Sequence, residues 1–108
     1  MVVRRLVDNS ADVQAAILLD AAGTPIASSD DDTGRTRELA DLARRLVETA
    51  DGATDEPIEQ VEVQAAGGSA FAVRSPRHVL ACVASRAALP ALVLYDLRHA
   101  LLELERPA

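Results

Sequence analysis

One apolar segment, with the turn that follows it, constrains the fold of this chain more than any other feature. The segment Val13–Leu19 stops at Asp20 and the chain becomes apolar again at Pro25-Ile26-Ala27. A strand that is apolar on both faces belongs in the doubly covered centre of a sheet. Aspartate and glycine at the first and fourth positions of Asp20–Gly23 predict a type I turn and a tight antiparallel return. Because proline cannot donate a hydrogen bond, the returning strand is expected at or near a sheet edge.

The remaining periodicities complete the predicted fold. They indicate a short helix over 1–9, a helix from about Gly34 to Asp51, strands over Pro57–Gln64, Ser69–Ser75 and Val79–Ala84, and a helix over Ala88–Glu105. Acidic or threonine side chains are expected to cap the middle helix at its start, and Gly52 is expected to end it. The strand Val79–Ala84 is again apolar on both faces, so helices must cover both sides of an antiparallel sheet. The sequence therefore predicts an α/β protein, a three-layer α/β/α sandwich forming a single domain over residues 1–108.

Composition excludes several classes of function. The formal net charge is −6 and aromatic residues make up 2% of the 108 residues, which disfavours nucleic acid as a partner. All 11 basic residues are arginine, so the chain has no lysine for a P-loop or a Schiff base. No apolar stretch is long enough to cross a membrane, and Met1–Arg5 is not followed by a signal-like apolar segment. Together with the single cysteine, this predicts a cytoplasmic protein without membrane insertion.

Each residue with reactive chemistry has a simpler structural interpretation. Asp20 suits a turn, and the acidic run at Asp30–Asp32 suits the start of a helix. The remaining candidates lack a partner at catalytic or metal-ligand spacing; they are Ser28, Ser29, His78, His99 and Cys82. Cys82 is expected to be buried and inert, and Tyr95 to pack with its hydroxyl in water. The sequence predicts no catalytic residues, no metal site and no cofactor.

Two surface features remain as candidate sites. The strand near Ile58–Gln64 alternates, and it is predicted to form a sheet edge that pairs with its own copy across a two-fold axis. The predicted dimer residues are Ile58, Gln60, Val61, Glu62, Val63 and Gln64. The alternative is a solvated edge protected by glutamates.

The second feature is the outer face of the middle helix, which mixes both signs of charge. Its residues are Glu38, Asp41, Arg44, Arg45 and Glu48. Such a face is a reasonable docking surface in a protein without a catalytic site. The alternative is a face that is merely solvated.

The order of these segments resembles the Roadblock/dynein-light-chain family. The resemblance spans roughly residues 3–105, and its most specific parts are the hairpin AAILLDAAGTPIASS and the helix LPALVLYDLRHAL. It also includes RELADLARRLVETAD, IEQVEV, FAVRS and VLACVAS. The resemblance implies a five-stranded antiparallel sheet with one helix on one face and two on the other.

The resemblance also implies a function. Its bacterial members regulate Ras-like GTPases in gliding motility and polarity, and they pair through the third strand and middle helix. That correspondence adds Arg37 to the candidate partner-binding residues, so the surface runs from Arg37 to Glu48. The implied activity positions the GTPase's own residues, so neither Arg37 nor its neighbours would act as an arginine finger.

Three functions therefore stay open. The first is a homodimeric regulator of a small Ras-like GTPase, as an activator or an effector. The second is a dimeric scaffold without an effect on hydrolysis. The third is a small-ligand sensor, which requires a pocket beside small residues such as Ala15, Ala16, Ala81 and Ala84. A closely packed core would count against the sensor. An enzyme is the least favoured reading, because no nucleophile and base pair can be assembled.

Overall fold

The order of secondary structure elements confirms the predicted order α-β-β-α-β-β-β-α. In the computed structural model the described residues are 2–53 and 59–106. The elements are α1 (Val2–Asn9), β1 (Val13–Asp20), β2 (Pro25–Ser28), α2 (Thr33–Ala53), β3 (Gln60–Ala65), β4 (Gly68–Arg74), β5 (His78–Ala84) and α3 (Pro90–Glu105). The predicted strand over Pro57–Gln64 thus starts at Gln60 among the described residues, and Pro57 and Ile58 lie outside them.

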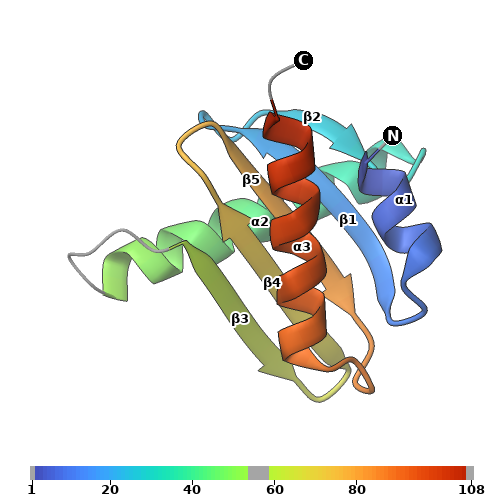
Figure 1. Cartoon of the computed structure of the whole chain (residues 1–108). Helices are drawn as coiled ribbons and strands as arrows, with labels where there is room; N and C mark the ends of the chain where they lie inside the picture. Colours follow the sequence, from blue (N-terminus) through green and yellow to red (C-terminus); the bar gives the residue numbers. More distant parts are fainter. Residues whose placement is uncertain (1, 54–58, 107–108) are drawn as a thin grey trace.

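The five strands form one antiparallel sheet in the order β2-β1-β5-β4-β3 (Figure 1). Hairpins join β1 to β2, β3 to β4 and β4 to β5. The pairing of β1 with β5 joins the β1–β2 hairpin to the later strands β3 to β5, with Ile17 opposite Ala81 and Leu18 opposite Leu80. The prediction that these two strands are central and that β2 lies at an edge is confirmed.

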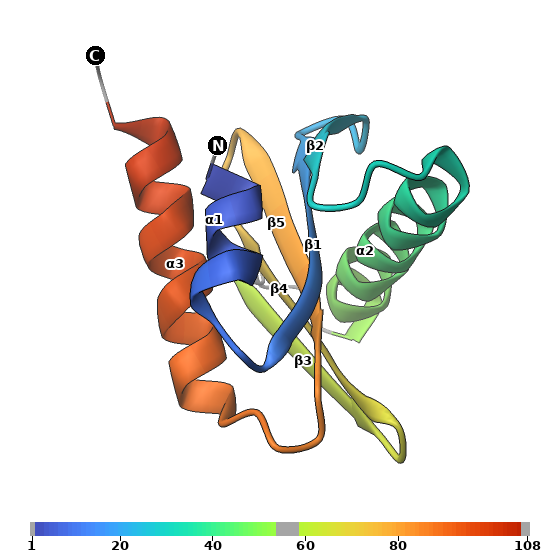
Figure 2. The same ribbon diagram turned by 90° about the vertical axis from the view of Figure 1, so that its right-hand side faces the viewer.

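Helices cover both faces of the sheet, as Figure 2 shows. Helix α2 packs on one face against Ile17 and Leu19, whereas α1 and α3 pack on the other face against Ala16 and Leu18. Alternate residues of β1 therefore enter opposite cores, as the period of two in a strand requires. Phe71 is fully buried in the core under α1 and α3. The fold is the three-layer sandwich with one helix opposite two.

The turn between β1 and β2 forms as the sequence predicts. The Gly23 amide donates to the Asp20 carbonyl at 3.0 Å, and the φ angle of Gly23 is +88°. The Asp20 side chain adds two bonds, because its Oδ1 accepts from the amides of Ala22 and Thr24, each at 2.9 Å. Asp20 is thus a turn residue.

Only one of the two predictions for the ends of α2 is correct. Asp32 caps the start, since its Oδ1 accepts from the Arg35 amide at 2.9 Å. The expectation that Gly52 ends the helix is wrong: α2 continues to Ala53, and Gly52 is not among the glycines with positive φ. Among residues 2–53 and 59–106, no atom lies within 4 Å of a Cβ built at Gly52, so this exposed last turn tolerates a glycine without using its left-handed conformation.

Two expectations for the last helix are also corrected. Helix α3 starts at Pro90, and Leu89 is its N-cap residue with 61% of its surface exposed. The helix therefore starts two residues later than the predicted start at Ala88. Tyr95 is 54% exposed and does not pack into the core. Within the described residues, no helix has the length and hydrophobicity that crossing a membrane requires.

Gly68, at the start of β4, is held close to the neighbouring strand. Its φ is +153°, and a Cβ built there would lie 2.6 Å from the Ala84 carbonyl oxygen. At the adjacent Gly67, no atom of the described residues lies within 4 Å of the same position. The β3–β4 hairpin therefore requires glycine at one position and not at the other.

We expect Gly68→Ala to lower the free energy of unfolding by at least about 1 kcal/mol, because alanine is strained at this φ and meets backbone. The matched variant Gly67→Ala should change it by less than about 0.5 kcal/mol. Urea denaturation followed by circular dichroism measures both values. Equal losses in the two variants would contradict the steric explanation.

Candidate functional site

Strand β3 forms one edge of the sheet, and within the described residues only β4 pairs with it. Gln60, Glu62 and Gln64 face the α3 side, because Glu62 lies opposite Phe71, whereas Val61 and Val63 face the α2 side. Val63 is 47% exposed although it is apolar. Ile58, the first residue of the predicted dimer set, lies outside the described residues. The remaining five present an open strand edge.

The predicted partner face on α2 is divided by the structure into free and anchored side chains. Arg37, Glu38, Arg45 and Glu48 are exposed. Arg44 and its partner Asp41 are half-buried. The Arg44 Nη1 donates to the Gly23 carbonyl at 2.7 Å, and Nη2 forms an ion pair with Asp41. Arg44 therefore fastens α2 to the β1–β2 turn, a role that its spacing in the sequence does not reveal.

A second anchor joins the end of α2 to the strand beside the edge. The Arg74 guanidinium donates two hydrogen bonds to the Asp51 carboxylate, at 2.8 and 2.7 Å. The hydrogen bond from Arg74 holds the pKa of Asp51 below its ordinary value, and the same bond raises the pKa of Arg74. Because Arg74 also donates its amide to the Glu59 carbonyl at 2.8 Å, it connects α2, β4 and the approach to β3. The edge strand and the α2 face are thus held as one surface.

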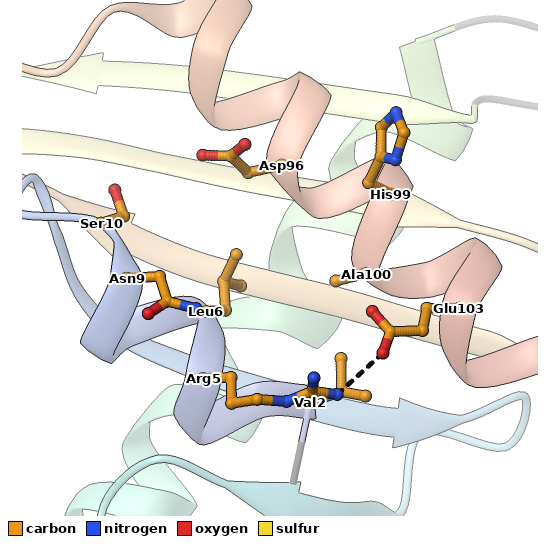
Figure 3. A pocket seen from close by; sticks show the side chains of 9 residues that line it. All are labelled: Val2, Arg5, Leu6, Asn9, Ser10, Asp96, His99, Ala100 and Glu103. Atoms are coloured by element: carbon orange, nitrogen blue, oxygen red, sulfur yellow. Dashed lines mark hydrogen bonds and ion pairs between the residues drawn. The ribbon is translucent and has the colours of Figure 1, made fainter.

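On the opposite face of the sheet, α1 and α3 enclose an open groove of about 280 Å³ (Figure 3). The Arg5 guanidinium and the Glu103 carboxylate form an ion pair of 2.8 Å across one end. The other end holds Asn9, Ser10 and Asp96. Sequence reasoning did not find this groove, since it arises from packing two helices that are far apart in the chain.

A serine, a histidine and a glutamate meet at the β4–β5 turn, but not in the geometry of acyl transfer. The Ser75 hydroxyl donates to Glu105 Oε2 at 2.6 Å, and His78 Nδ1 pairs with the same oxygen at 2.6 Å. In a catalytic triad the serine instead donates to the imidazole. Burial raises the pKa of Glu105, but the hydrogen bonds from His78 and Ser75 outweigh it and hold the pKa below its ordinary value. This cluster ties α3 to the sheet.

The other candidate reactive groups are in structural positions as well. Burial raises the pKa of Cys82 to about 12, which leaves its thiol protonated and unreactive at neutral pH. Asp31 pairs with Arg4 at 2.9 Å, and Asp30 Oδ1 accepts from the Asp32 amide at 2.8 Å. His99 lies against the Tyr95 ring, with centroids 4.2 Å apart. Over residues 2–53 and 59–106, no group of histidine, cysteine and acidic side chains is arranged to hold a metal ion.

Fold and surface together define a class of protein: a small three-layer α/β/α sandwich with an open strand edge. A family model described as the Roadblock/LC7 domain matches residues 2–85. The chain belongs to the Roadblock/LC7 domain family. The family resemblance inferred from the sequence is confirmed.

Solved structures agree with this assignment. A Roadblock/LC7 domain from Streptomyces avermitilis has a TM-score of 0.85 at 21% identity, covering 95% of this chain and 91% of that one. MglB from Myxococcus xanthus has a TM-score of 0.72 at 18% identity, covering 95% and 88%. The gliding protein MglB from Thermus thermophilus has a TM-score of 0.65 at 14% identity, covering 92% and 79%. A sequence comparison with curated proteins found no significant match. At these identities the similarity establishes the fold.

The two arginines that are adjacent on α2 are expected to differ in their effect on stability. Arg44→Ala removes the hydrogen bond to Gly23 and the ion pair with Asp41, and should lower the free energy of unfolding by about 1 kcal/mol. Arg45→Ala, at an exposed position, should change it by less than about 0.5 kcal/mol. Thermal and urea denaturation measure both. If Arg45→Ala proves the more damaging variant, the anchoring role of Arg44 is wrong.

Proposed function

We propose that this chain is a cytoplasmic, homodimeric and non-catalytic regulator of a small Ras-like GTPase. The observation that carries the proposal is the open edge of β3 beside the exposed, charged face of α2. Both surfaces lie on one rigid unit, since Arg74 and Asp51 hold the end of α2 against the strands. The resemblance to bacterial family members supports the choice of a GTPase as partner, and the MglB structures share the fold.

Dimerisation follows from the properties of the edge. An unpaired strand edge presents backbone donors and acceptors that a second strand can satisfy. Pairing of β3 with its own copy across a two-fold axis continues the sheet and repeats each contact twice. Val63 supplies exposed apolar surface on the α2 side of this edge, which a neighbouring copy would cover.

The contact with the GTPase is assigned to the exposed side chains of α2. Arg37, Glu38, Arg45 and Glu48 are accessible, whereas Arg44 and Asp41 are engaged within the fold. Mixed charges of this kind set orientation and the rate of association more than affinity. The chemistry of hydrolysis belongs to the GTPase, because the clusters described above serve structural roles. The regulator acts by positioning the residues of its partner.

The dimer is tested at the two edges of the sheet. Val63→Arg on β3 should raise the dimer dissociation constant by at least about tenfold, because a charge replaces an apolar contact at the interface. The matched control is Ile26→Arg on β2, which is 52% exposed at the other edge and should leave the dimer intact. Sedimentation equilibrium measures both. A wild-type monomer at tens of micromolar, a concentration at which a stable interface assembles, would overturn the dimer.

The regulatory role is tested with the Ras-like GTPase encoded nearest the gene. We expect this chain to bind the GTP-loaded form and accelerate hydrolysis, and the double variant Arg37→Glu/Arg45→Glu to lose both effects. Arg86→Glu, at an exposed position in the loop between β5 and α3, is the control that should retain them. Binding with an unchanged rate of hydrolysis would instead make the chain an effector or a scaffold. Absence of binding in either nucleotide state would overturn the GTPase proposal for that partner.

A further inference from the structure

Exposed apolar side chains are concentrated on one helix. The large hydrophobic residues that are exposed in the described part of the chain are Ile26, Val63, Leu89, Leu92, Tyr95 and Leu102. Four of these six belong to α3 or its N-cap. Leu92, Tyr95 and Leu102 are 57%, 54% and 66% exposed. Most of the large exposed apolar side chains in the described part of the chain therefore belong to α3 and its N-cap.

These residues form a continuous seam along the helix. Leu92, Tyr95, His99 and Leu102 follow the spacing i, i+3, i+7 and i+10, which places them on one side of an α-helix. His99 continues the seam, since its ring lies against that of Tyr95. The opposite side of α3 is already buried, with Leu97 fully inaccessible in the core. The seam is thus additional to what folding requires.

A helix that is apolar on both sides is normally covered on both sides. Contiguous apolar surface on a small soluble domain commonly marks a site of interaction. The spacing of the seam is that of a helix that packs against a second helix. Its geometry therefore favours a helical partner over an irregular one.

Charge beside the seam indicates what kind of helix fits. The α1–α3 groove runs along one flank, and Asp96 lines it. Glu103 is paired with Arg5, but Asp96 takes part in no hydrogen bond or ion pair with any described residue. The chain as a whole carries a formal charge of −6. A basic side chain on a partner would find its counter-charge in the groove.

We propose that the seam Leu92–Tyr95–His99–Leu102 and the adjoining α1–α3 groove dock an amphipathic helix of another protein. The apolar side chains of that helix cover the seam, and an arginine or lysine on its flank enters the groove beside Asp96. The site lies on the face of the sheet opposite α2, so it is separate from the surface assigned to the GTPase. It gives the chain a second partner and does not depend on the proposed function.

Charge weighs against two other occupants. If a second copy packed its α3 antiparallel across a two-fold axis centred on the seam, the two copies of Asp96 would face each other on the same flank. An anionic membrane surface would repel a chain with a net charge of −6. Both occupants are still measured as outcomes of the test.

The chain contains a built-in reporter for this surface. It has one tyrosine, Tyr95, and no tryptophan, so its tyrosine fluorescence reports on the seam alone. The probes are three synthetic helical peptides without tyrosine or tryptophan. The first has a leucine seam flanked by arginine, the second has the same seam flanked by glutamate, and the third has the composition of the first in scrambled order. We expect the first to change the fluorescence of Tyr95 and to bind at least about tenfold more tightly than the other two.

Variants locate the binding. Leu92→Ser/Leu102→Ser should raise the dissociation constant of the first peptide by at least about tenfold, since it removes apolar contact from both ends of the seam. Asp96→Asn should reduce the preference for arginine over glutamate while keeping the seam. Ile26→Ser, which alters an exposed apolar residue elsewhere, should have no effect. Circular dichroism verifies that each variant is folded.

Four results would each overturn the proposal: no fluorescence change with the first peptide, equal affinity for the glutamate peptide, a loss of oligomer mass in Leu92→Ser/Leu102→Ser, or binding to vesicles of phosphatidylserine. The third result would mean that a second copy occupies the seam, and the fourth that a membrane does. Val63→Arg and Arg37→Glu/Arg45→Glu should leave peptide binding unchanged. Failure of this site is therefore distinguishable from failure of the GTPase proposal.

Discussion

The pairing of β1 with β5 is the interaction on which the rest of this molecule depends. It joins a hairpin near the start of the chain to a strand much later in the sequence, in register from Ala15 opposite Val83 to Asp20 opposite His78, with a shift in register between Val13 and Ala15. Both strands are covered on both faces, so each contributes side chains to two separate cores. Contacts of such long range close large loops and carry the entropic cost of doing so. Once they form, α2 can pack on only one face, and α1 and α3 share the other.

Because the centre of the sheet is closely packed, the candidate binding sites lie on the surface of the molecule. Ala16, Ala81 and Ala84 are almost completely buried in the middle of the sheet, where small side chains allow the helices to approach closely. Within the described residues no buried polar side-chain atom lacks a hydrogen-bond partner, so no polar group of the core awaits a ligand. In the described part of the chain, the hollow of about 160 Å³ between α2 and the β1–β2 turn, lined by Leu19, Arg44 and Val79, is open to solvent and is not an enclosed ligand site. The β3 edge, the α2 face and the outer side of α3 are surfaces available to partners.

The accuracy of the sequence-based predictions follows the range of the interactions involved. The turn at Asp20–Gly23 and the cap at Asp32 were predictable because local backbone geometry determines them. The position of Tyr95 was not, because its apolar neighbours along the chain suggested burial, whereas α3 turns Val93, Leu94 and Leu97 inward and leaves Tyr95 outside. The start of this helix was predicted two residues too early, at Ala88, because Pro90 sets the first turn of α3 and Leu89 before it becomes an extended cap.

The sequence by itself determined the order of the elements, the doubly covered strands, the likeness to the Roadblock family and the absence of lysine chemistry. The likeness depends on sequence motifs, and the other properties depend on periodicity, turn residues and composition, all of which a single chain displays directly. Only the tertiary structure decided that Arg44 anchors the β1–β2 turn, that Arg74 forms two hydrogen bonds with Asp51, and that α1 and α3 enclose a groove. The physical reason is distance along the chain: each of these contacts joins residues that only the sheet brings together, and nothing in their local sequence marks them as partners.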